Sequence, residues 1–114
     1  MPHLRFRAVS VDTLQQISTP LLADLCALTG GKPEFVTLEC VASTQVRDGA
    51  IDAGFPFVEL VWFERPQEVQ DAAAALITRH LKAVLGEQIY VVVQVLPIVK
   101  SAYYSNGQIG RAHV

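Results

Sequence analysis

The chain has 114 residues, of which 51% are hydrophobic and 18% are charged, and its formal net charge is −2. This length fits one domain with a single core. The basic residues are scattered along the chain and form no cluster of the kind that binds nucleic acid, so the sequence does not indicate a nucleic-acid-binding protein. No apolar run reaches the length of a membrane span, and no secretory signal precedes the first predicted strand. We therefore expect a cytoplasmic protein with no membrane or nucleic-acid partner.

The first eight residues predict a β-strand that begins with a proline. Apolar or small residues occupy positions 2, 4, 6 and 8, and they alternate with His3, Arg5 and Arg7. Pro2 is tolerated at the front of a strand, and one interpretation is that it only begins the element. If Met1 is removed, however, Pro2 carries a free secondary amine. Burial disfavours the charged form of an amine, so this nitrogen could act as a base near neutral pH.

The next segment predicts an amphipathic helix. Ser10 or Asp12 can cap a helix that begins near Thr13, and leucines and isoleucines then recur at spacings of three and four. Pro20 lies inside this pattern and is expected to kink or split the helix. Residues 29–33 are expected to end the helix, with a glycine supplying the left-handed cap and Pro33 preventing continuation.

The rest of the chain alternates between strands and one further helix. The pattern predicts strands over residues 35–42, 57–63 and 88–96, a polar loop over 43–54, and a helix from Pro66 to the residue before Gly86. Pro97 is expected to end the last strand. In the tail, residues 98–114, the pair Asn106-Gly107 predicts a tight turn.

This order gives two β-α-β units and an α+β fold, a four-stranded sheet with two helices on one face. Two helices cover only one face of such a sheet, yet all four strands are apolar, so a partner chain is the simplest cover for the other face. Single polar residues stand near the middle of each strand. We expect them to form a charged cluster around an oligomer axis: Arg5 or Arg7, Glu39, Glu59 and Gln94.

With Pro2 at the front of two β-α-β units, the chain resembles the tautomerase superfamily over nearly its whole length. Thr29–Pro33 (TGGKP) is similar to the TGKP segment of the macrophage migration inhibitory factor group, and Ile89–Val91 is similar to the start of its last strand. The opening Met1–His3, the Asp48-Gly49 loop and the Leu96-Pro97 break are similar to 5-carboxymethyl-2-hydroxymuconate isomerases. In overall pattern the chain is similar to a group of small bacterial tautomerase-like proteins.

This resemblance implies a homotrimer with a pocket at each subunit boundary and a small enol or keto acid as substrate. Pro2 would be the general acid and base, Lys32 would bind the carboxylate, and Tyr90 would line a neighbouring subunit's pocket. A developing enolate also needs positive charge, for which Arg47 is a further substrate-binding candidate. Val92 stands where the migration inhibitory factor group has an asparagine, so one polar pocket group is absent.

Two classes of function remain open. One is a tautomerase or isomerase, and the alternative is a non-catalytic trimer of the same fold that acts as a binding or structural protein. No metal or other cofactor is expected, because the histidines and cysteines lack ligand spacing and Gly30-Gly31 follows a helix instead of opening one. The residues considered as metal ligands are His3, His80, His113, Cys26 and Cys40. The two cysteines are expected to be isolated thiols.

Overall fold

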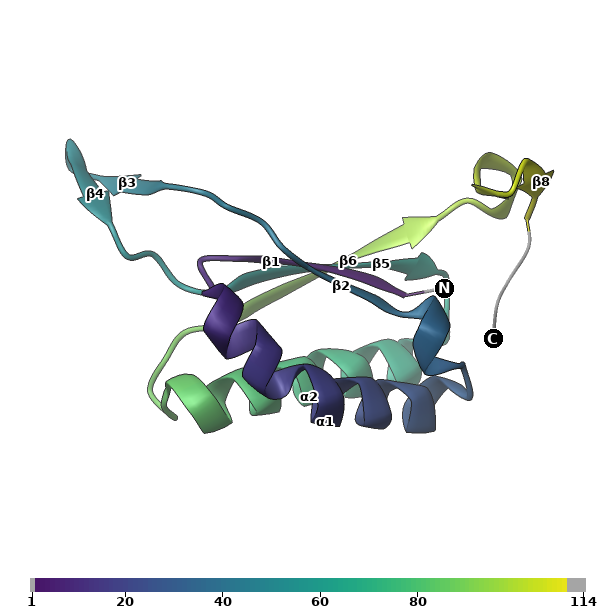
Figure 1. Ribbon diagram of the computed structural model, residues 1–114, viewed down its shortest axis with the longest axis horizontal. Helices are drawn as coiled ribbons and strands as arrows, with labels where there is room; N and C mark the ends of the chain where they lie inside the picture. The colour runs from purple at the N-terminus through teal and green to yellow at the C-terminus, as the bar shows by residue number, and fades with distance from the viewer. Residues whose placement is uncertain (1, 111–114) are drawn as a thin grey trace.

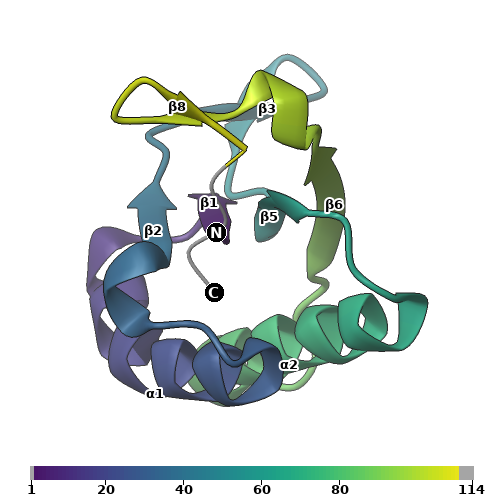
Figure 2. The same ribbon diagram turned by 90° about the vertical axis from the view of Figure 1, so that its right-hand side faces the viewer.

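A computed structural model describes residues 2–110, and His113 lies outside the described residues. One mixed sheet has the strand order β2-β1-β5-β6, with strands β1 (His3–Arg7), β2 (Thr37–Cys40), β5 (Phe57–Phe63) and β6 (Val92–Ile98). Helices α1 (Val11–Thr29) and α2 (Gln67–Leu85) both lie on one face of this sheet (Figures 1 and 2). β1 and β2 are parallel, β5 and β6 are parallel, and the two pairs meet through the antiparallel contact of β1 with β5. The predicted α+β fold of two β-α-β units is confirmed.

Helix α1 begins at a polar cap and continues past its internal proline. The Ser10 hydroxyl accepts a hydrogen bond from the Thr13 amide at 3.1 Å, which satisfies one of the amides that a helix start leaves unpaired. The helix runs unbroken through Pro20 and bends along its length (Figure 1), so the proline kinks it without splitting it. Gly30 ends it with a φ of 76°, as predicted.

The ends of two predicted strands were wrong. The second strand begins at Thr37 because Pro33–Phe35 form a short 3-10 helix (η1) before it. The last strand begins at Val92, not at residue 88, and it extends through Pro97 to Ile98. Pro97 is accommodated because β6 is an edge strand, where a missing backbone donor can face away from the sheet.

The predicted polar loop over 43–54 contains a short hairpin, β3 (Gln45–Arg47) with β4 (Ala50–Asp52). Its turn residues, Asp48 and Gly49, both have positive φ, the geometry that two-residue hairpin turns require. A second hairpin, β7 (Tyr104–Ser105) with β8 (Gln108–Ile109), turns at Asn106-Gly107 as predicted. A 3-10 helix, η2 (Lys100–Ala102), connects β6 to it. Both hairpins rise on the side of the sheet opposite the helices, one at each end (Figure 1).

The core lies between the sheet and the two helices. Successive residues of a strand point to opposite faces of the sheet, so alternate residues of β1 and β5 are buried in this core. Each helix contributes the apolar side chains of one of its faces. The fully buried apolar side chains include Leu4, Phe6, Leu21, Leu25, Val58, Leu60, Trp62, Ile77 and Leu81. Cys26 and Cys40 are free thiols, each partly buried. Within residues 2–110, neither helix has the length and apolar character that crossing a bilayer requires.

Candidate active site

The candidate site begins at the end of the sheet where the chain starts. The parallel and antiparallel pairings bring the beginnings of β1 and β2 to the same edge as the ends of β5 and β6. Pro2 lies at this edge, which we call the proline end, and it is buried. Its carbonyl accepts a hydrogen bond from the Thr37 amide at 3.1 Å, so β2 fixes the backbone directly at the proline.

Lys32 is brought to the same end of the molecule. The left-handed residue Gly30 turns the chain out of α1, and Lys32 then stands immediately before η1, which leads into β2 beside Pro2. The Lys32 carbonyl accepts a hydrogen bond from the Phe35 amide at 3.0 Å, and the side chain is exposed to solvent. A cation at the rim of the proline end is therefore available to an anionic ligand.

Arg47 and Tyr90 lie at the opposite end of the sheet, where β5 and β6 begin. Arg47 is in the β3–β4 hairpin, with its Nε 3.9 Å from the Asp52 carboxylate. Tyr90 directly precedes β6; its ring packs edge-on against Phe55 with centroids 4.9 Å apart and remains 67% exposed. One protomer thus separates Pro2 and Lys32 from Arg47 and Tyr90 by the length of the sheet.

Two further cations at the proline end were missed by the sequence analysis. The Arg65 guanidinium lies over the ring of Trp62 at 5.3 Å, and the Lys100 ammonium lies 5.8 Å from the centroid of Phe63. Cation–π contacts of this kind leave the N–H groups of a guanidinium available at its edge. The available signal was the position of Arg65, two residues after the end of a strand whose final pair is Trp-Phe and directly before Pro66, the N-cap of α2.

A cavity of about 500 Å³ opens beside these groups. Phe63 and Lys100 form part of its wall, and the Tyr103 ring packs edge-on against Phe63 with centroids 5.2 Å apart. The remaining lining residues are Glu64, Pro97, Ile98 and Val99. The lining thus combines aromatic and aliphatic walls with one cation, Lys100, and one carboxylate, Glu64, and it does not include Pro2, Lys32 or Arg65.

The open face of the sheet carries the predicted polar row. Arg5 pairs in register with Glu39 on one side and with Glu59 on the other, and Glu59 pairs with Gln94. Glu59 accepts a hydrogen bond from Arg7 Nη1 at 2.8 Å and lies 3.4 Å from Arg5 Nε. The prediction that these polar residues share the uncovered face is confirmed.

His3 extends the same face toward the proline end. Its Nδ1 is hydrogen-bonded to the Thr37 hydroxyl, and its Nε2 lies 3.2 Å from the Glu39 carboxylate. Both ring nitrogens are therefore engaged by β2, so His3 ties the edge strand to β1.

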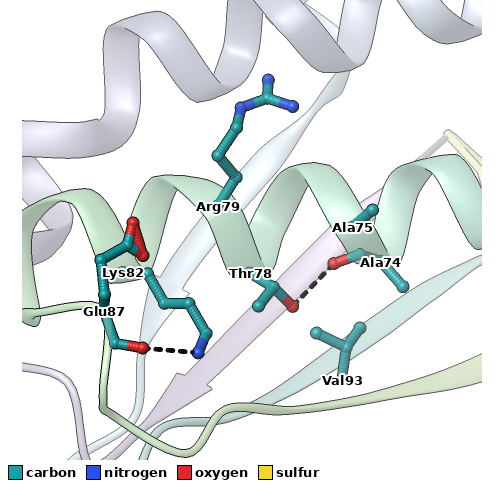
Figure 3. Close-up of a pocket in the computed structure, with 7 residues that line it drawn as sticks. All are labelled: Ala74, Ala75, Thr78, Arg79, Lys82, Glu87 and Val93. Atoms are coloured by element: carbon teal, nitrogen blue, oxygen red, sulfur yellow. Dashed lines mark hydrogen bonds between the residues drawn. The ribbon is translucent and has the colours of Figure 1, made fainter.

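Another cavity of about 500 Å³ lies between α2 and β6 (Figure 3). Ala74 and Ala75 form part of its lining, and the Lys82 ammonium donates a hydrogen bond to the Glu87 carbonyl at 2.9 Å. Arg79 also lines it, and its guanidinium lies 3.3 Å from the Asp24 carboxylate on α1. None of the predicted site residues lines this groove.

Comparison with known proteins shows which family the chain matches. A family model described as "Domain of unknown function (DUF1904)" matches residues 1–109. A DUF1904 structure from Sebaldella termitidis is 29% identical, with 96% of this chain and 99% of that chain covered and a TM-score of 0.89. A protein of unknown function from Vibrio cholerae is 33% identical, with coverages of 95% and 86% and a TM-score of 0.87.

The fold extends beyond these relatives. A structure described as "F6 fused 4-OT wild type asymmetric trimer" has a TM-score of 0.81 at 15% identity, with 95% of each chain covered. At this identity the likeness concerns the fold alone. No curated protein matches the chain in sequence.

Proposed function

Because the chain belongs to the DUF1904 family and has the fold of the tautomerase superfamily, we propose that it is a tautomerase or isomerase of a small carboxylic acid. It interconverts the enol and keto forms, with Pro2 as general acid and base. The observation that carries the proposal is the buried Pro2 at the start of β1, at the end of the sheet to which Lys32 and two other cations are also brought.

The chemistry follows from an amine placed beside a carbonyl compound. The lone pair of the Pro2 nitrogen takes a proton from the carbon next to the carbonyl, and the electrons of that C–H bond form the C=C bond of the enol. The carbonyl electrons move to oxygen, and this oxygen, stabilised by a nearby cation, then takes the proton from the protonated Pro2, which regenerates the free amine. Ketonisation is the reverse, in which Pro2 returns the proton to carbon. Met1 must be removed first, because a proline nitrogen in a peptide bond is an amide and is not basic.

Assembly is part of the proposal. In a homotrimer, the proline end of one copy meets the opposite end of its neighbour, so Pro2 and Lys32 of one protomer share a pocket with Tyr90 and Arg47 of another. The open face with its Arg5–Glu59–Arg7 ion pairs would be buried against the other copies. The fused 4-OT of the same fold, which is described as a trimer, supports the trimeric assembly. We place the protein in the cytoplasm.

The test is ketonisation of phenylenolpyruvate and of 2-hydroxymuconate, followed by ultraviolet absorbance. It compares untagged protein, shown by mass spectrometry to begin at Pro2, with a form that retains Met1. We expect turnover only with free Pro2, and loss of turnover in Pro2→Ala at unchanged oligomeric state. Equal rates with and without Met1 would overturn the role of Pro2.

The second candidate is a non-catalytic trimer that binds a ligand or serves a structural role. The observation favouring it is that Glu59 forms ion pairs with both Arg5 and Arg7, so these cations of the open face already have a partner within the protein. No turnover on either acid by the free-Pro2 protein, together with an intact trimer, would favour this second function.

A further inference from the structure

Arg65 is held in an unusual position for a surface arginine. It lies in the short connection between β5 and α2, its side chain is partly buried, and its guanidinium covers the ring of the fully buried Trp62 at 5.3 Å. Its Nε is buried and has no hydrogen-bond partner within residues 2–110. A buried donor without a partner costs about 1–3 kcal/mol, a cost that an arriving acceptor removes.

The strand register places this arginine beside the proline. His3 pairs with Val61 in the antiparallel ladder of β1 and β5. One step further along, Pro2 stands opposite Trp62, and residues directly opposite each other in such a ladder point to the same face. Pro2 and Trp62 are both buried, as expected for the helix-covered face. The guanidinium that covers Trp62 therefore lies at the same end of the sheet as the proposed base.

The chemistry of this pair fits one class of ligand. Stacking on an indole ring occupies the face of a guanidinium but leaves the N–H groups at its edge free to bind. These groups, on Nε and the two Nη atoms, form a fork that matches the two oxygens of a carboxylate. The stack also fixes the plane of that fork. Lys32, by contrast, is an exposed point charge on a flexible side chain.

We propose that Arg65 is the residue that binds the substrate carboxylate next to Pro2. This inference rests on the proposed function. A carboxylate held by the Arg65 fork orients a planar 2-oxo acid so that its adjacent carbon faces the Pro2 nitrogen. Lys32 is then a cation at the rim of the pocket and not the main carboxylate-binding residue.

The experiment combines turnover with a binding assay that needs no turnover. Trp62 is the single tryptophan of the chain, so its fluorescence reports directly on the guanidinium above it. Free-Pro2 protein would be titrated with phenylacetate, an unreactive carboxylate, and assayed in parallel with phenylenolpyruvate. The variants are Arg65→Gln, Arg65→Lys, which keeps the charge but loses the fork, and Arg79→Gln as the matched control on an exposed arginine of α2.

We expect Arg65→Gln to weaken phenylacetate binding and to raise KM at least tenfold, with an unchanged thermal midpoint. Arg65→Lys should weaken phenylacetate binding and raise KM by smaller factors, and Arg79→Gln should have the binding and the KM of the wild type. Wild-type binding and wild-type KM in both folded Arg65 variants would overturn the proposal.

The two proposals fail separately. Phenylacetate binding that depends on Arg65, without turnover by any form, supports the carboxylate site and removes the catalytic role of Pro2. Turnover that depends on free Pro2 but is indifferent to both Arg65 substitutions keeps the proposed function and overturns this inference.

Discussion

Asp24 on α1 and His80 on α2 join the two helices, with 2.6 Å between the Asp24 Oδ2 and the His80 Nε2. The His80 side chain is only 15% exposed, whereas Arg79, which reaches the same carboxylate at 3.3 Å, is 66% exposed. The His80 side chain is therefore a mostly buried part of α2. Its position shows that it also closes a hydrogen bond between the two helices.

We expect His80→Ala to lower the free energy of unfolding by about 1–2 kcal/mol, since it removes a partly buried hydrogen bond to a charged group. Arg79→Ala should change it by less than about 1 kcal/mol, the usual range for an exposed ion pair. Urea denaturation followed by circular dichroism measures both. Equal losses in the two variants would contradict the assignment of His80 as the main helix-to-helix contact.

Glu59 is the shared acceptor of two arginines on the open face of the sheet. Glu59→Gln leaves Arg5 and Arg7 close together without a neutralising charge, so we expect dissociation of the proposed trimer at micromolar concentration. Sedimentation velocity measures the assembly. Glu39→Gln is the matched control, because Glu39 is on the same face but more exposed, and it should leave the assembly intact. A Glu59→Gln protein that sediments as the wild type does would show that the ion pairs are not needed for association.

Gly54 follows the β3–β4 hairpin with a φ of 68°, and a Cβ atom there would stand 2.5 Å from Gln45 Cγ. We expect Gly54→Ala to destabilise the hairpin by about 2–3 kcal/mol, because it adds a clash to the strain of a left-handed residue. Gly49→Ala shares the positive φ but meets no atom within 4 Å, so it should cost about 1–2 kcal/mol. Amide hydrogen exchange across residues 45–52 compares the two. A smaller loss for Gly54 than for Gly49 would count against the predicted clash.

Tyr90 offers a test of the shared pocket. Tyr90→Phe keeps the edge-on contact with Phe55 and removes only the hydroxyl, so we expect unchanged stability and a fall in kcat/KM of about tenfold, equal to about 1.4 kcal/mol. Mixing Tyr90→Phe with Pro2→Ala protein should restore part of the activity, since each defect would fall in a different protomer. No recovery in mixed trimers would place the two residues in separate sites.

The strands with clear alternation were predictable from sequence. The pattern of β1 and β5 comes from residues that alternate between the core and the open face, such as Leu4 and Phe6 against Arg5 and Arg7. The start of β6 was not predictable, because Ile89-Tyr90 has the composition of a strand but comes before the residue that pairs with Phe57, the first residue of β5. Composition describes what a segment can pair with, and tertiary structure decides where pairing begins.

Only some residues of the candidate site could be predicted from the sequence. Pro2 and Lys32 were predicted from a resemblance that depends on local sequence, and the structure brings them to one end of the sheet. Arg65 was missed because its role depends on Trp62 and on the register between β1 and β5, neither of which is local to the arginine. The separation of Tyr90 from Pro2 within a protomer depends on the antiparallel order of the two β-α-β units in space, for which single-sequence periodicity gives no signal.

Pro97 has a consequence for what can attach to the edge of the sheet. It lies near the end of β6, opposite Trp62, on the outermost strand. A strand of another chain that extends the sheet along this edge finds backbone donors up to Pro97 and none at it, so the added ladder is interrupted there. Pro97 therefore works against open-ended extension of the sheet along this edge.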